Sequence, residues 1–362
     1  IKKKEASIFP KKSQINRFVM NELTRDNRFH ESEIKIRDPF KIDPSLCIYS
    51  PQENVDSIGH PKIKSWVKFI KNEWTPSQTP KGLKRVALII PCTKYKPYLT
   101  SREHKAINNS LFSNGWNSIG VSEAPTALEK FIEENDDQRI FHEGSLKKNN
   151  LILDRIVISE PLGLVPYEFV YYWKGKQSPA TSYDDPGLFE SRGTSVSPYR
   201  QDCTATKISG QKWRWGIEER SSYVQMHNHL VEVVTTTLLR VSKNYHCIGA
   251  WVSPGLTHRS FLADKKLRHE EKIPLNRKTK NGIQKLFGVL DFAPNLLTIM
   301  PTVEQLKISQ KELGIRLKKE GRNSSPRSVR AVYARGDGND TPLGLYETLQ
   351  HLLKWLNKIE KK

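Results

Sequence analysis

The chain has 362 residues, of which 36% are hydrophobic, enough for one or two ordinary cores and two or three modules. Lysine and arginine together number 59 against 39 aspartate and glutamate residues, a formal net charge of +20. A cationic excess of this size predicts a polyanionic partner, and nucleic acid comes first because cations near phosphates release condensed counterions. A lysine-rich solvated surface and an anionic membrane surface are the two alternatives.

No apolar run approaches the roughly 18 residues that a transmembrane helix needs, and the first residues, IKKKE, are not followed by the apolar core of a signal peptide. The sequence therefore predicts a soluble, cytoplasmic protein with no membrane partner. The chain has 4 cysteines, which lie far apart and form no C-x-x-C pair: Cys47, Cys92, Cys203 and Cys247. This spacing argues against a zinc knuckle or an iron–sulfur cluster, so we expect reduced thiols, no metal and no cofactor.

The predicted elements begin after a basic N-terminal arm, residues 1–44, which is weakly periodic and interrupted by prolines, so that little core is expected there. Residues 61–74 place apolar side chains at helical spacing with lysines between them, which predicts an amphipathic helix with a basic outer face. The unbroken apolar run at residues 86–90 predicts a buried strand of a mainly parallel sheet, whose carboxyl end faces a ligand crevice. Ser101 is the expected N-cap of a helix that ends near residue 114.

Further elements follow in an alternating order that is typical of an α/β domain. They are a helix at residues 124–134, a buried strand at 151–159 and a long functional loop or insertion at 174–212. A long amphipathic helix at residues 218–241 and a third strand at 246–252 follow. We therefore predict an α/β core at residues 45–255, with a central, mainly parallel sheet flanked by helices. Residues 256–362 predict a basic, mostly helical C-terminal region, with helices at residues 282–290, 303–320 and 343–359 and a hinge or flexible loop at residues 322–330.

The segment between the first strand and the next helix, PCTKYKPYLTSREH at residues 91–104, brings a thiol, ammonium groups, hydroxyls and an imidazole into one turn region. Cys92 is the candidate nucleophile, because Lys94 or Lys96 and a helix N-terminus would stabilise its thiolate. With Ser101 as the N-cap, His104 occupies the third helical position, near the same crevice. The alternative interpretation makes Cys92 a buried small hydrophobe and the lysines and His104 ordinary surface residues.

The same segment resembles the signature of archaeosine synthases, in which P-C is followed after three residues by K-P-Y, after two more by S and after two more by H. Every specified position is filled. The sequence SEPLGLVP at residues 159–166 resembles the family's second block, and YDDPG at residues 183–187 resembles a third block more loosely. The resemblance covers residues 45–255.

Two features depart from the family. Longer members carry a transglycosylase-like domain before this core and an RNA-binding PUA domain after it, and neither is recognisable in this sequence. After the second proline of the second block the family usually has arginine, whereas this chain has Tyr167, followed by the expected Glu168. The sequence thus predicts a compact, divergent form of the family, with an altered phosphate or substrate contact at Tyr167.

The resemblance implies a transferase that adds an amine, with L-lysine as the expected donor, to the nitrile of 7-cyano-7-deazaguanine in tRNA. A separate radical-SAM lyase would then act on the adduct. The expected catalytic residues are Cys92, whose thiolate would attack the nitrile carbon, and Lys96 or His104, which would transfer the protons. The expected substrate-binding residues are Pro97, Tyr98, Ser101, Ser159, Gly163, Glu168 and Asp184, with Asp185 beside it as a further carboxylate for an amino group or a base edge.

Two other functions are consistent with the sequence. A non-catalytic tRNA-binding subunit that partners the radical-SAM enzyme would keep the fold without the reaction. A different base-directed enzyme, of the glycosylase or base-exchange type, would act without an amine and release a base or sugar product. In each case the basic C-terminal region is the expected place for phosphate contacts, with the N-terminal arm as the second choice.

Overall fold

The computed structural model describes residues 25–185, 195–210 and 212–361. Its centre is a seven-stranded sheet built from β1 (Lys84–Pro91), β2 (Asn117–Ser118), β3 (Leu146–Lys148), β4 (Leu151–Ser159), β5 (Gly163–Pro166), β10 (Cys247–Trp251) and β13 (Thr298–Met300). The strand order is β13-β10-β1-β4-β3-β2, and β5 also pairs with β4. The first four strands in this order run parallel, whereas β3, β2 and β5 pair antiparallel. The prediction of an α/β fold around a mainly parallel sheet is confirmed.

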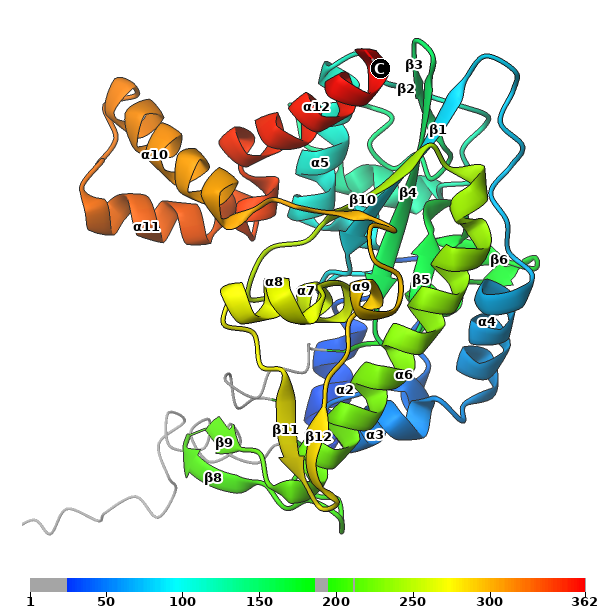
Figure 1. Ribbon diagram of the computed structural model, residues 1–362, viewed down its shortest axis with the longest axis vertical. Helices are drawn as coiled ribbons and strands as arrows, with labels where there is room; N and C mark the ends of the chain where they lie inside the picture. Colours follow the sequence, from blue (N-terminus) through cyan, green and yellow to red (C-terminus); the bar gives the residue numbers. More distant parts are fainter. Residues whose placement is uncertain (1–24, 186–194, 211, 362) are drawn as a thin grey trace, which may run out of the picture.

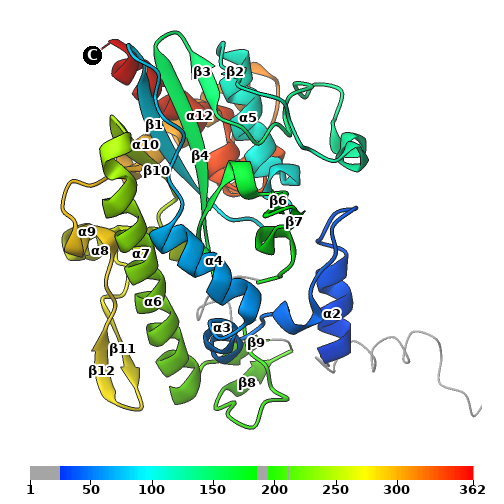
Figure 2. The same cartoon turned by 90° about the vertical axis from the view of Figure 1, so that its right-hand side faces the viewer.

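Helices cover both faces of this sheet (Figures 1 and 2). On one side lie α5 (Arg102–Ser113) and α12 (Tyr346–Lys361), and on the other lie α4 (Pro61–Asn72) and α6 (Ile217–Val241). The side chains of β4 are buried along its whole length, as expected for a strand that is covered on both faces. The apolar positions of α6 that the sequence places at helical spacing are all buried: Tyr223, Met226, Leu230, Val234, Leu238 and Val241.

The predicted helices on either side of β1 are also confirmed. In α4 the side chains of Ile63, Trp66 and Ile70 are buried and most of the lysines are exposed. In α5 the hydroxyl of Ser101 accepts the backbone N–H of His104 at 3.2 Å, so Ser101 is the N-cap that the sequence predicts. The expected helix at residues 124–134 is wrong, because only a short 3-10 helix (Thr126–Phe131) forms there.

The expectation of little core in residues 1–44 is wrong for the described part of that segment, and residues 1–24 lie outside the description. Helix α2 (Arg25–Glu33) is followed by Ile36, Phe40 and Ile42, whose side chains are buried in the main hydrophobic core. Phe40 stacks on Tyr171 with 6.0 Å between the ring centroids. Helix α3 (Pro51–Ser57) follows and packs against α6.

The C-terminal region combines confirmed helices with elements that the sequence did not predict. Helix α10 (Val303–Lys319) is confirmed, and α12 covers most of the third predicted helix. Residues 282–290 are not a helix: β11 (Asn276–Thr279) and β12 (Gly282–Lys285) form a hairpin, which α9 (Val289–Phe292) follows. Much of the predicted hinge belongs to α11 (Pro326–Ala334), which packs on α10. Figure 1 shows α10 and α11 projecting from the body as one lobe.

The remaining elements are small hairpins and short helices. The long loop predicted at residues 174–212 contains parts of two small hairpins, β6 (Tyr172–Trp173) with β7 (Lys176–Gln177) and β8 (Thr206–Ser209) with β9 (Lys212–Arg214). After β10 the chain forms α7 (Thr257–Leu262) and α8 (Lys265–Glu270). Among the helices that the structure describes, none combines the length and apolarity required to cross a bilayer.

Candidate active site

Cys92 is the first residue after β1, at the carboxyl end of the central parallel strands. Its backbone N–H donates to the carbonyl of Ile158 at 3.0 Å, so the pairing of β1 with β4 fixes its position. The side chain is half-buried and lines a cavity of about 380 Å³, a volume in the usual range for small-molecule sites. A cavity therefore lies at the end of β1, where the sequence predicts a ligand crevice. We call this space the Cys92 cavity.

Three neighbouring parallel strands supply the reactive side chains of the Cys92 cavity. Cys92 follows β1, Glu160 follows β4, and His258 lies on α7 after β10. These strands are adjacent in the order β10-β1-β4, so their carboxyl ends meet at one edge of the sheet. Glu103 on α5 and four more charged residues, Lys35, Lys94, Asp185 and Asp340, complete the charged part of the lining.

The imidazole of His258 faces the Cys92 thiol, with 3.3 Å between Nε2 and Sγ. The other ring nitrogen, Nδ1, has no hydrogen-bond partner among the described residues. A thiol and an imidazole in this arrangement form a nucleophile and a general base. Sequence reasoning missed His258, although it follows the third predicted strand closely, and loops after parallel strands share one edge of the sheet.

Burial determines the charge state of this pair. It raises the pKa of the Cys92 thiol to about 11, although the Lys96 ammonium and a hydrogen bond with Ser159 act in the opposite direction. Burial also lowers the pKa of His258, against the attraction of the carboxylates around it. At neutral pH the pair is therefore a neutral thiol beside a neutral imidazole. Lys96 stabilises the thiolate, as the sequence predicts, but the cost of desolvating the thiolate is larger than this attraction, so the pKa rises.

Three carboxyl groups stand around His258 in the Cys92 cavity. Burial raises the pKa of Glu103 to about 7. Burial, together with the neighbouring Asp185 carboxylate, raises the pKa of Glu160 well above its ordinary value, and the two side chains are hydrogen-bonded. Two carboxyl groups in contact hold a proton between them, because both cannot ionise cheaply. An ammonium group that enters the cavity would relieve this repulsion and take the place of the proton.

Lys96 and Asp184 are both fully buried and form an internal ion pair, with 3.7 Å between Nζ and Oδ1. Lys35 lies closer to the same carboxylate, with 2.6 Å between Nζ and Oδ2. The Lys96 ammonium also lies 4.6 Å from the centre of the Tyr183 ring. Neither Lys96 nor Asp184 lines the Cys92 cavity, whereas Asp185, the neighbour of Asp184, does. Lys96 acts on Cys92 through its charge.

His104, predicted as a catalytic proton carrier, does not reach the Cys92 cavity. It is fully buried, its Nε2 lies 2.9 Å from the carbonyl oxygen of Pro91, and its Nδ1 lies 2.6 Å from the hydroxyl of Tyr167. Burial lowers the pKa of His104 to about 4. Both ring nitrogens are thus engaged in a neutral imidazole that ties α5 to the end of β1. The place expected for His104 belongs to His258.

Tyr167 is buried between His104 and Arg155. Its ring stacks on His104, with 5.8 Å between centroids and 12° between the planes. The guanidinium of Arg155, a residue of β4, lies 4.4 Å from the centre of the same ring. The guanidinium that lies against Tyr167 therefore comes from β4. Tyr167 is an internal residue and does not form the predicted phosphate contact.

Tyr98, Ser159 and Tyr183 form a buried cluster of hydroxyl groups that joins the three sequence blocks. The Tyr98 hydroxyl lies 2.9 Å from that of Tyr183 and donates to Ser159 Oγ at 3.3 Å. Ser159 is also hydrogen-bonded to Tyr183 and to the Cys92 thiol. The structure thus brings Tyr98 and Ser159 together beside Cys92. Of the third block, residues 186 and 187 lie outside the described part of the chain.

Four other predicted site residues have structural positions outside the Cys92 cavity. Ser101 caps α5, and buried Pro97 precedes the turn that leads into it. Gly163 has φ +77° in the turn between β4 and β5, and an added Cβ would lie 2.8 Å from Val233 Cγ1. The carboxylate of Glu168 accepts the indole N–H of Trp74 at 2.8 Å. The predicted substrate contacts of Gly163 and Glu168 are therefore not brought to this site.

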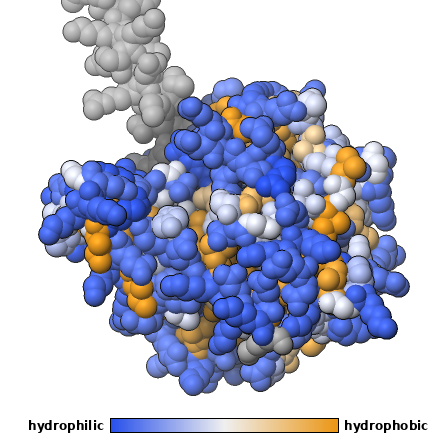
Figure 3. Space-filling model, turned by 90° about the horizontal axis from the view of Figure 1, so that it is seen from above, coloured by the Kyte–Doolittle hydropathy of each residue, from blue (hydrophilic) through white to orange (hydrophobic). Residues whose placement is uncertain are grey.

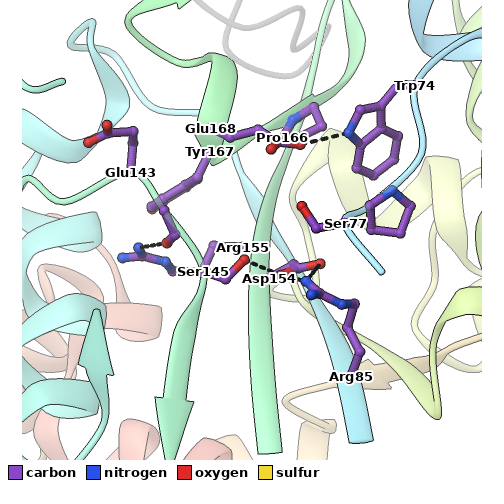
Figure 4. A pocket seen from close by; sticks show the side chains of 12 residues that line it. Trp74, Ser77, Arg85, Glu143, Ser145, Asp154, Arg155, Pro166, Tyr167 and Glu168 are labelled. Atoms are coloured by element: carbon purple, nitrogen blue, oxygen red, sulfur yellow. Dashed lines mark hydrogen bonds and ion pairs between the residues drawn. The ribbon is translucent and has the colours of Figure 1, made fainter. Parts of the chain in front are cut away.

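Glu168 instead borders a much smaller cavity, of about 20 Å³, over the opposite half of β4 (Figure 4). Its main feature is the buried ion pair between Arg85 and Asp154, with Nη1 at 2.7 Å from Oδ1 and 2.9 Å from Oδ2. The same carboxylate accepts hydrogen bonds from the hydroxyls of Ser145 and Tyr245. This network links β1, β4 and the chain before β10, and it serves the stability of the sheet.

We expect Asp154→Ala to lower the free energy of unfolding by about 3–5 kcal/mol, because it leaves the Arg85 guanidinium buried without its counterion. Urea denaturation, followed by circular dichroism, measures the change. Glu232→Ala is the control, since it removes the exposed partner of Lys71 and should cost at most about 1 kcal/mol. Equal losses in the two variants would contradict a structural role for the buried pair.

Within the described ranges, no three metal-ligating side chains cluster in a way that could hold a metal ion. In comparisons with family models, curated proteins and solved structures, nothing matches this chain.

Proposed function

We propose that the protein adds an amine to the nitrile of 7-cyano-7-deazaguanine in cytoplasmic tRNA, as an archaeosine-synthase-like transferase. The observation that carries this proposal is the pairing of the Cys92 thiol with His258, 3.3 Å apart, beside a group of carboxyls in one cavity. A nitrile carbon is an electrophile that a thiol can attack when a base removes its proton. The carboxyl groups suit the positive charge of an amine donor, for which L-lysine is our first choice.

The first step forms a covalent bond between the protein and the base. Sγ of Cys92 attacks the nitrile carbon while Nε2 of His258 takes the thiol proton. The imidazolium then gives this proton to the nitrile nitrogen, so that a neutral thioimidate results. The buried ammonium of Lys96 stabilises the negative charge that develops on sulfur, as it does for the thiolate.

The second step transfers the carbon to the amine. The amine nitrogen attacks the thioimidate carbon and loses a proton to His258, and the C–S bond breaks as the proton returns to sulfur. The products are an amidine-type adduct on the tRNA and the free Cys92 thiol. Because an amine arrives largely as its ammonium form, the hydrogen-bonded pair of Glu160 and Asp185 would bind it and accept the proton it must lose. A separate radical-SAM lyase would act on this adduct.

The experiment that tests the proposal is the intact mass of a purified tRNA that carries 7-cyano-7-deazaguanine, after incubation with the protein and L-lysine. A gain of one whole lysine is the expected result, since the reaction is an addition. Parallel incubations with glutamine and with ammonium salts identify the donor. Tight tRNA binding with no mass gain from any donor would favour the tRNA-binding subunit, and release of the base would favour the glycosylase-type enzyme.

A further inference from the structure

A second cavity, of about 360 Å³, adjoins the Cys92 cavity and is lined by three arginines. Arg102 comes from the first turn of α5, Arg322 from the segment between α10 and α11, and Arg335 from the end of α11. We call it the arginine cavity. Asp340 lines both cavities, and Arg102 is followed directly by Glu103, which lines the Cys92 cavity.

The three arginines differ in how many of their guanidinium N–H groups already donate hydrogen bonds. Arg322 donates to both oxygens of Asp337, at 2.6 and 3.1 Å, and Arg316 donates to the same carboxylate at 2.8 Å. These contacts keep the pKa of Asp337 below its ordinary value, and they neutralise its charge. Asp337 therefore does little to repel an anion in the cavity.

Arg102 and Arg335, in contrast, are exposed and make only long contacts with backbone carbonyls. Arg102 Nη1 lies 3.4 Å from the carbonyl oxygen of Gly338, and Arg335 Nε lies 3.3 Å from that of Ala331. Within the described parts of the chain, their other guanidinium N–H groups have no acceptor. A guanidinium has five donors in a planar fork that matches the oxygens of a phosphate.

We infer that Arg102 and Arg335 bind a backbone phosphate of the RNA whose modified base enters the Cys92 cavity. This inference rests on the proposed function and adds the place where the RNA backbone is held. An enzyme that acts on one base must take it out of the helical stack, and contacts with adjacent phosphates fix its register. The shared Asp340 wall places such a phosphate beside the cavity that receives the base. The projecting lobe of α10 and α11 offers a largely hydrophilic surface for the same strand (Figure 3).

The test measures binding of an unmodified tRNA transcript, which needs no nitrile and no reaction. We expect the double variant Arg102→Gln/Arg335→Gln to bind about tenfold more weakly than the parent, with a salt dependence reduced by about one to two phosphate contacts. The matched control is Lys64→Gln/Lys68→Gln, which removes the same charge from exposed positions on α4, outside the arginine cavity and outside the lobe of α10 and α11. The control should bind tRNA within about twofold of the parent.

Inorganic phosphate is the second probe, because a free anion would use the same donors. Unchanged tRNA binding by the double variant would overturn the inference, and a loss of inorganic phosphate binding alone would assign the cavity to the free anion. Equal losses in the two double variants would also overturn it, since any basic residue would then serve. Selective loss of tRNA binding supports the inference even if the parent forms no lysine adduct, and in that case the proposed reaction fails while the phosphate site stands.

Discussion

Replacing Cys92 with alanine is expected to lower the rate of adduct formation on nitrile-bearing tRNA by about a thousandfold or more. The substitution removes the atom that forms the covalent thioimidate, and the remaining groups can only position the amine for direct attack. Binding of the tRNA itself should change little, because the thiol contributes no phosphate contact. Single-turnover rates, measured by the intact mass of the tRNA, give the effect on the chemical step.

Cys247→Ala is the matched control for this variant. The Cys247 thiol is also half-buried, and burial raises its pKa to about 11, as it does for Cys92. Cys247 differs from Cys92 in position: it is the first residue of β10 and does not line the Cys92 cavity. The control should react at the parental rate. Full turnover by the Cys92→Ala protein would mean that the amine attacks the nitrile directly in a site that only positions it.

Replacing His258 with glutamine is expected to lower kcat/KM by about 10²–10⁴-fold, the usual contribution of a general base. Glutamine keeps a polar group near the thiol but cannot carry the proton. Because burial lowers the pKa of His258, its neutral, basic form persists to a more acidic pH than that of a free imidazole. The kcat/KM of the parent should therefore stay constant as the pH falls through about 6.5 and decline only below it.

The pH profile separates a catalytic role of His258 from a structural one. Activity that remains in the His258→Gln protein should lack the acidic decline that protonation of the imidazole causes. His269→Gln, which alters an exposed imidazole on α8, should show the parental profile. A His258→Gln protein with parental kcat/KM, or with an unchanged acidic limb, would remove His258 from the mechanism.

Long, strongly periodic segments of the fold were predictable because local pattern and tertiary burial agree in them. The apolar run of β1 and the helical spacing of α6 each describe a surface that is buried in the same way in the structure. The prediction failed at residues 282–290, where apolar residues also recur at helical spacing. There Lys280 and Asn281 form the turn of a hairpin, Gly282 at the start of β12 has φ +87°, and Ile283 is exposed. Asn-Gly is a strong hairpin signal, and it prevails over a short helical pattern.

The residues of the site also fall into two groups: those that a local sequence pattern predicts and those that depend on tertiary packing. Cys92 and the hydroxyls near it belong to short sequence blocks, so their importance could be inferred from a contiguous pattern. His258 reaches Cys92 only because β10 pairs with β1, and that pairing joins residues far apart in the chain. His104 was placed on the correct helix, but which of its faces is buried depends on packing against Tyr167. The ionisation of Cys92 depends on desolvation, which neighbours in the sequence do not reveal.

The central claim, that the Cys92 thiol attacks the nitrile, is tested most directly by withholding the amine. The protein would be incubated with tRNA bearing 7-cyano-7-deazaguanine, quenched under denaturing conditions, and analysed by intact mass and by digestion to a peptide linked to a nucleotide. We predict a covalent complex that maps to Cys92 and disappears when L-lysine is added, as the tRNA gains one lysine. A protein that forms the lysine adduct at full rate but never a covalent complex would contradict the claim.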